Sequence, residues 1–193
     1  MITFHLGTNQ SKSSYVLFYQ YTLLFLKKYP KQKNVYNLFI MNKLFESFDS
    51  SENEKLFVNK LEHDHMILLE LYKEMTQYEC PCKRSNTKTH KEYENETKHI
   101  THKVWSLIHK CTFEYFENPS RSLQDVVFYF FANEVRRIPC KVCMRHYTKY
   151  VLDCDFRDVC SSRDKLSRWL VDLHNEINVR NEKPIIPYED VNF

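Results

Sequence analysis

Glycine is almost absent from this chain, and that absence narrows the folds it can form. Gly7 is the only glycine among 193 residues, so residues 8–193 lack the one residue type that takes positive φ freely. Phosphate-binding loops and the dinucleotide fingerprint of doubly wound folds need glycines that let the backbone approach phosphate, so both are excluded. Tight β-hairpin turns favour glycine as well. With 15% aromatic residues, the composition therefore predicts an all-α protein with ring-filled helix interfaces.

Charge and hydropathy exclude two classes of partner. The 28 basic and 25 acidic residues are interspersed, and the net charge is +3, without a block of one sign of the kind that binds nucleic acid. No apolar run reaches the roughly 18–20 residues that a membrane span needs. We therefore expect no nucleic-acid partner and no membrane span.

The chain divides into three parts. Residues 1–50 alternate aromatic patches with polar residues and are interpreted as an N-terminal appendage. Apolar residues recur at helical spacing over about 52–78, which predicts an amphipathic helix. The almost wholly polar segment 83–103 is interpreted as a solvated linker. The expected organisation is an appendage over 1–50, a helix with a CxC motif and a linker over 51–100, and a domain over 101–193.

Four short helices are expected after residue 103, because prolines and the Cys154–Ser162 stretch divide this region. They cover about 104–117, 122–137, a segment that starts at the Pro139-Cys140 junction, and about 162–181. The last has an apolar stripe with a polar stripe beside it, the latter made of His174, Asn178 and Asn181. The two adjacent stripes predict a buried polar ligand.

The strongest chemical motif is Cys140-Lys141-Val142-Cys143, which follows a proline at an expected helix start. Unpaired N–H groups and the positive end of the helix dipole lower the pKa of a thiol placed there. A CxxC pair can form a small reducible disulfide, but half of a zinc site has the same spacing. From these residues alone, redox chemistry and metal binding remain equally good interpretations.

The surrounding residues favour redox chemistry. The order and spacing of four motifs closely resemble those of the Erv/ALR family of FAD-linked sulfhydryl oxidases over about residues 101–190. The residues around the CxxC resemble those of viral members of that family. The four motifs are WxxxH at 105–109, PCxxC at 139–143, HNEIN at 174–178 and Lys183-Pro184. The resemblance implies a four-helix bundle with a short fifth helix that binds FAD, preceded here by a helical N-terminal extension.

The resemblance also implies which residues enclose FAD. Carried over by position, they are Trp105, His109, His174, Asn175, Asn178 and Lys183. An indole stacks on planar rings, amides satisfy polar ring and ribose edges, and a lysine meets a pyrophosphate. Tyr115 and Tyr147 are further expected ring neighbours. FAD binding by these residues would need no glycine.

The implied reaction has two halves. A protein dithiol reduces the Cys140–Cys143 disulfide by exchange, with Cys140 attacked and Cys143 next to the flavin, and molecular oxygen then reoxidises the flavin to give hydrogen peroxide. Family members often carry a second, relaying pair, for which Cys80 and Cys82 are the upstream candidates. A homodimer is also implied. The compartment would be host-cell cytoplasm or virion for a viral member, and the mitochondrial intermembrane space for a cellular one.

Two other classes stay open at this point. One is a zinc-binding interaction module that uses Cys80, Cys82, Cys140 and Cys143, and the other is a catalytically inactive helical scaffold; the oxidase interpretation itself needs no metal. Cys154 and Cys160 are either bridged or free. Val171 and Tyr188 stand where many cellular members carry a structural disulfide, so that staple is absent.

Overall fold

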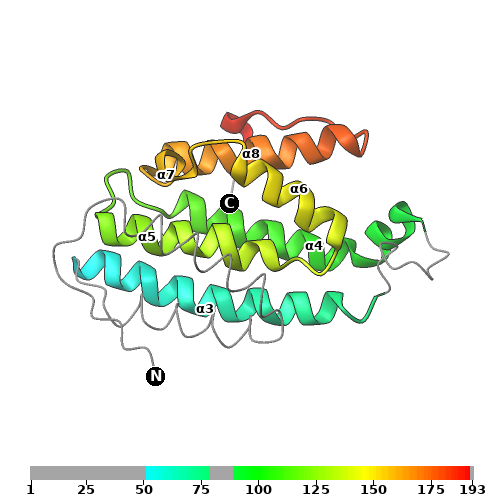
Figure 1. The fold of residues 1–193 in the computed structure, drawn as a ribbon, viewed down its shortest axis with the longest axis horizontal. Coiled ribbons are helices and arrows are strands. Elements are labelled where there is room, and N and C mark those ends of the chain that lie inside the picture. Colours follow the sequence, from blue (N-terminus) through cyan, green and yellow to red (C-terminus); the bar gives the residue numbers. More distant parts are fainter. Residues whose placement is uncertain (1–50, 79–88, 192–193) are drawn as a thin grey trace, which may run out of the picture. The chain divides into compact units, whose positions relative to one another are not determined.

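The computed structural model describes residues 51–78 and 89–191, and all regular structure in these residues is helical (Figure 1). The all-α prediction is confirmed. The predictions for residues 1–50 and for Cys80 and Cys82 lie outside the described residues. The helices are α3 (Glu52–Met75), α4 (His90–Phe113), α5 (Arg121–Tyr129), α6 (Lys141–Leu152), α7 (Phe156–Val159) and α8 (Arg163–Arg180), with a 3-10 turn at Tyr188–Asp190.

Helix α4 begins at His90, so the prediction of a linker as far as residue 103 is wrong. Thr89 and Glu92 form a reciprocal capping box, which satisfies backbone N–H groups at the helix start. Tyr93, Thr97 and Ile100 are buried at helical spacing, although the residues around them are exposed. One narrow packed face is sufficient to order a segment that reads as polar throughout.

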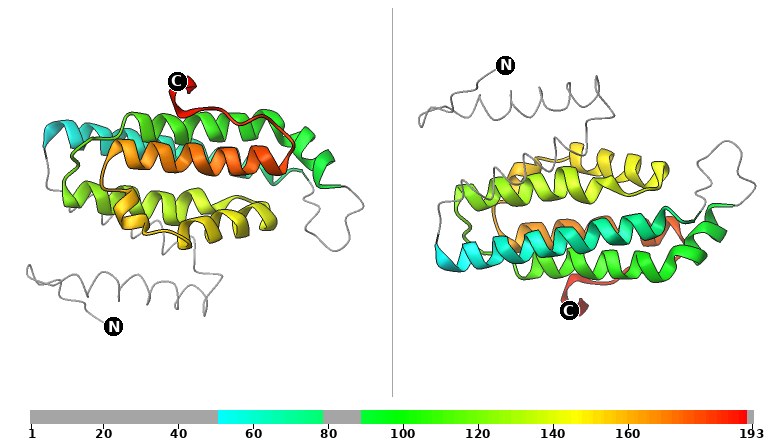
Figure 2. Two further views of the ribbon diagram at one scale, coloured as in Figure 1. Left: turned by 90° about the horizontal axis from the view of Figure 1, so that it is seen from above. Right: turned by 90° about the horizontal axis from the view of Figure 1, so that it is seen from below.

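Helix α3 is part of the helical core. It lies against α4, and α4 lies against α8 (Figure 2). The other three helices expected after residue 103 are present as α5 with its continuation, α6 and α8, and the four-residue α7 falls in the stretch expected to divide the last two. None of the helices in the described residues is long and apolar enough to cross a membrane.

The continuation of α5 is irregular, whereas the sequence predicts one regular helix over 122–137. Phe130–Glu134 is a wider π-helix, and Val135–Arg137 is a tighter 3-10 turn. A π-turn adds one residue to the helical repeat and is often found near functional sites. The Tyr147 hydroxyl donates to the Phe131 carbonyl at 2.9 Å, and all five π-helical residues are buried. This segment leads directly to Pro139 and Cys140.

The C-terminal segment is held in place by Tyr188. The Tyr188 hydroxyl lies 2.6 Å from Ser167 Oγ, and the ring stacks on Phe113 with centroids 5.6 Å apart. The Arg168 guanidinium lies 4.1 Å from the Tyr188 ring centroid. Tyr188 thus holds the end of the chain against α8 and α4 by non-covalent contacts.

Candidate redox and cofactor site

The CxxC pair stands at the start of α6, as the sequence predicts. Cys140 is the N-cap residue, and its Sγ accepts a hydrogen bond from the backbone N–H of Cys143 at 3.3 Å. Both cysteines are thiols in this structure. The interaction with Cys140 and then burial raise the pKa of the Cys143 thiol well above its usual value. The Cys143 thiol therefore keeps its proton in this arrangement.

The two sulfurs differ in exposure. Cys140 is fully buried at 0% exposed, whereas Cys143 is partly exposed. The prediction that a substrate thiol attacks Cys140 comes from the family resemblance and stays a prediction. In this arrangement such an attack requires a movement that uncovers the Cys140 sulfur.

Two residues near the pair come from the first turns of α4 and were missed in the sequence. Burial, then Cys140 and Cys143, raise the pKa of Tyr93 to about 12. The negative charge of Glu94 contributes to the raised pKa of Cys143. The signal that could have found them is the TxxE capping box at 89–92, which marks a helix start ahead of Tyr93.

Helices α4 and α8 bring three predicted cofactor residues into one ring cluster. The rings of Trp105 and His174 are stacked, with centroids 4.0 Å apart and planes 9° apart. His109 Nε2 lies 3.0 Å from His174 Nδ1, and the Trp105 and His109 rings are 5.7 Å apart. The WxxxH motif and the late HNEIN motif, far apart in sequence, therefore meet in space.

Both histidines in the cluster are uncharged at neutral pH. Burial and then His174 lower the pKa of His109 to about 3. Burial, then Lys183 and His102, lower the pKa of His174 to about 4. Neutral imidazoles offer one donor and one acceptor nitrogen each, so they suit the mixed polar edge of a heteroaromatic ring.

The other three predicted cofactor residues lie at the end of α8. Asn178 is buried, and its backbone carbonyl accepts from Lys183 N at 2.8 Å. Glu182 has a φ of 55°, a left-handed conformation that closes the helix end where glycine is usual. The Lys183 side chain is exposed and close enough to His174 to lower its pKa.

Asn175 has a structural partner. Its side-chain amide donates to the Ile186 carbonyl at 2.8 Å, and its Oδ1 accepts from Ile186 N at 2.9 Å. This paired contact holds the segment after α8 in place. Contact between Asn175 and FAD stays a prediction.

The tyrosines expected as ring neighbours have structural partners. The Tyr115 hydroxyl donates to the Cys160 carbonyl at 2.9 Å, and Tyr147 bonds to the π-helix as described above. Cys160 is buried and Cys154 is exposed, and both are thiols in this structure.

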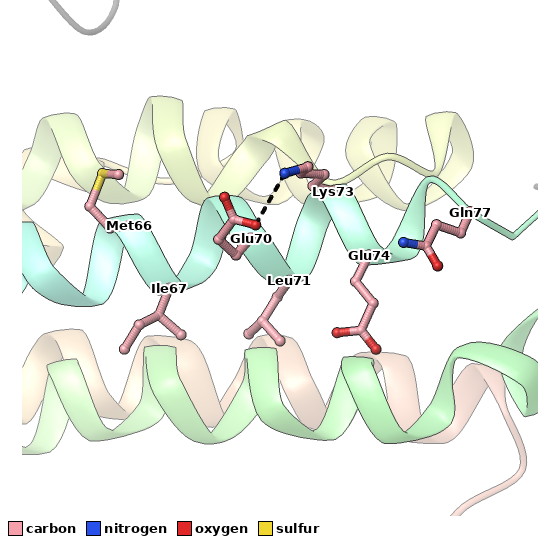
Figure 3. A pocket seen from close by; sticks show the side chains of 7 residues that line it. All are labelled: Met66, Ile67, Glu70, Leu71, Lys73, Glu74 and Gln77. Carbon is pink, nitrogen blue, oxygen red and sulfur yellow. Dashed lines mark hydrogen bonds and ion pairs between the residues drawn. The ribbon is translucent and has the colours of Figure 1, made fainter.

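Two pockets lie elsewhere. One of about 500 Å³ is lined by side chains of α3 from Met66 onward and by Gln77 just after that helix (Figure 3). Another of about 330 Å³ lies between α6 and α8 and is lined by His146, Cys154 and Trp169 among others. Within residues 51–78 and 89–191, no group of three or more His, Cys, Asp or Glu side chains is arranged to hold a metal ion.

The fold and the site define a helical protein with a CxxC pair at the start of a helix. Residues 102–193 match the Erv1 / Alr family. Two similar proteins carry the name FAD-linked sulfhydryl oxidase. The one of Invertebrate iridescent virus 3 is 31% identical over 42% of this chain, and the one of Acanthamoeba polyphaga mimivirus is 30% identical over 45%.

The matched stretches are partial. The chain spans 54% and 61% of the length of these two relatives. A crystal structure of a double cysteine-to-serine mutant of Erv1 from Saccharomyces cerevisiae is similar with a TM-score of 0.43 and 20% identity, over 58% of this chain and 87% of that one.

Proposed function

We propose that this protein is an FAD-dependent thiol oxidase that forms disulfides in protein substrates. The observation that carries the proposal is the Trp105–His109–His174 ring cluster, built by α4 and α8 in a chain with a CxxC pair at the start of α6. The names of the viral relatives support the same activity.

The side chains present fit FAD. The cluster offers flat aromatic surfaces and neutral ring nitrogens, with the buried Asn178 nearby on α8. Lys183 supplies a cation beside the cluster for a pyrophosphate. We assign FAD binding to Trp105, His109, His174, Asn175, Asn178 and Lys183. When bound, FAD supplies a two-electron acceptor that molecular oxygen can reoxidise, giving hydrogen peroxide.

The protein's own chemistry is thiol–disulfide exchange. A substrate thiolate attacks one sulfur of the Cys140–Cys143 disulfide, which breaks that bond and forms a mixed disulfide. The second substrate thiolate then displaces the protein sulfur, so the substrate leaves oxidised and the pair holds two electrons and two protons.

The visible spectrum of the purified protein tests this function. We expect a yellow protein whose flavin absorbance bleaches when a dithiol is added without oxygen and returns when oxygen is admitted. A colourless protein that loses helix content with a chelator would instead favour the zinc-binding module. A colourless protein that is unaffected by chelator would favour the inactive scaffold.

We also propose that Cys80 and Cys82 relay electrons from substrate to the Cys140–Cys143 pair. Thr89, at the start of α4, lies seven positions after Cys82 in the chain, a span of at most about 25 Å. Tyr93, one turn further along α4, interacts electrostatically with both Cys140 and Cys143. The relay pair is therefore tethered to the end of the helix that reaches the site.

Replacing both Cys80 and Cys82 by serine should separate two kinds of substrate. Activity toward a small artificial dithiol should stay, because that molecule reaches the active-site pair directly, while activity toward a protein dithiol should fall about tenfold or more, because the relay step is lost. Oxygen uptake with each substrate measures this. Equal loss toward both, or none toward either, rejects the relay.

The homodimer stays a separate prediction, checked by the mass of the protein in solution.

A further inference from the structure

Helix α3 holds the segment that leads into the CxxC pair. It lies outside residues 102–193, the part of the chain matched by the family. His65 Nε2 lies 2.8 Å from Glu134 Oε2, and Arg137 Nη1 donates to the same oxygen at 2.7 Å. Two helical turns further along α3, the Tyr72 hydroxyl donates to the Val135 carbonyl at 2.6 Å. These contacts fix the chain a few residues ahead of Cys140.

The contacts are buried, and one of them is an ion pair between Arg137 and Glu134, so they tolerate little displacement. Glu134 is 0% exposed, and His65 and Tyr72 are also buried. Burial alone would raise the pKa of Glu134, but the hydrogen bonds of His65 and Arg137 outweigh it and hold that pKa below its usual value. A buried carboxylate that loses such a partner has no water to replace it, which is costly.

The connection from these contacts to the dithiol is short and stiff. Val135 precedes Cys140 by five residues, and this stretch contains a 3-10 turn and Pro139, whose φ is fixed by its ring. Cys140 must keep its sulfur in line with the N–H of Cys143 to cap α6. A shift of the Val135 carbonyl would therefore move one thiol relative to the other.

We propose that α3, through Tyr72 and His65, positions Cys140 against Cys143 and thereby sets the stability of their disulfide. Tyr72 and His65 are positioning residues, since they act through Val135 and Glu134 and touch neither sulfur. The inference rests on the proposed function only in taking Cys140 and Cys143 to be a pair that cycles between dithiol and disulfide. Loosening the segment lowers the effective concentration of one thiol at the other, which disfavours the disulfide.

The matched test compares Tyr72→Phe with Tyr115→Phe in the full chain. Both substitutions remove one buried tyrosine hydroxyl that donates to a backbone carbonyl, Val135 in one case and Cys160 in the other. The equilibrium constant of the Cys140–Cys143 disulfide is measured against glutathione redox buffers, by trapping thiols and weighing the peptide that contains the pair. Tyr72→Phe should lower this constant about threefold to fivefold, because part of the free energy contributed by one hydrogen bond is lost from the disulfide state. Tyr115→Phe should leave the constant unchanged.

A second pair of variants covers the contact between His65 and Glu134. Glutamine can place its amide nitrogen near the position of His65 Nε2, so His65→Gln should keep the wild-type constant, while His65→Leu should lower it. If His65→Leu fails to fold, the two tyrosine variants decide. Equal constants for Tyr72→Phe and wild type, or equal shifts for both tyrosine variants, would overturn the inference and leave α3 as a stabilising helix only.

This experiment is independent of the flavin. Thiol trapping needs neither FAD nor oxygen, so a colourless protein in which Tyr72→Phe still lowers the constant contradicts the proposed oxidase and supports the positioning role. A yellow, active protein whose disulfide constant is insensitive to Tyr72→Phe supports the proposed oxidase and contradicts the positioning role.

Discussion

Serine at either Cys140 or Cys143 should abolish thiol-dependent oxygen consumption and leave the protein yellow. Exchange with substrate and transfer of electrons both need two sulfurs, so the loss should be on the order of a thousandfold or more. The fold should survive because Cys140 is an N-cap, and serine oxygen is a better N-cap acceptor than sulfur. FAD should stay bound because the ring cluster is built by α4 and α8. Oxygen-electrode rates and the visible spectrum together measure this.

Cys154→Ser is the matched control for these variants. Cys154 lies just beyond the other end of α6, is exposed, and its thiol donates to the backbone carbonyls of Tyr150 and Val151. Its replacement should leave the rate within about twofold of wild type, as for other exposed substitutions remote from a site. Turnover that persists in Cys140→Ser or Cys143→Ser would contradict the assignment of the pair.

Periodicity predicts the long helices well, because an apolar stripe at helical spacing is a property of the sequence itself. It locates both ends of α3 and α8 to within a few residues, and the Pro139-Cys140 junction locates the start of α6. It misses the first turns of α4, where Tyr93, Thr97 and Ile100 are the packed residues in an otherwise polar segment. The capping box at Thr89 was the one local signal that a helix starts there.

The π-helix before the dithiol is not readable from the sequence. Phe130–Glu134 continues the apolar pattern of α5, and the extra residue in its turn is stabilised by distant partners, among them Tyr147 at the Phe131 carbonyl and His65 at Glu134. Contacts of this kind are made only after the helices meet. A pattern of spacing within one helix carries no information about them.

The sequence predicts which residues form the site better than it predicts what those residues contact. The order of the motifs predicts Trp105, His109 and His174 as site residues, and the fold places them in one cluster. The exposure of Cys140 depends on what is packed around the start of α6, and no local rule gives it. The paired contact of Asn175 with Ile186 likewise depends on how the chain returns along α8.

Replacing both His174 and Asn178 by leucine should remove FAD from the protein. The two residues lie one turn apart on α8; His174 stacks on Trp105 and bonds to His109, and Asn178 supplies a buried amide. Leucine fills space but offers no polar edge to a ring. FAD at about 100 times its Kd should stabilise the wild type by about 2.7 kcal/mol, and this gain should vanish in the double variant. Thermal unfolding with and without added FAD, and the visible absorbance of the purified protein, measure the effect.

The control variant also has two residues replaced by leucine, on another face of α8. Asp172 and Glu176 are also one turn apart on α8, and Glu176 pairs with Arg180 in a surface contact that contributes little to stability. Asp172→Leu with Glu176→Leu should therefore keep both the yellow colour and the stabilisation by FAD. If instead the His174 and Asn178 double variant purifies as yellow as wild type, these two residues do not hold the cofactor. Loss of colour in both double variants would mean that leucine on α8 disturbs the helix itself, which would remove the support that this comparison gives to the assignment.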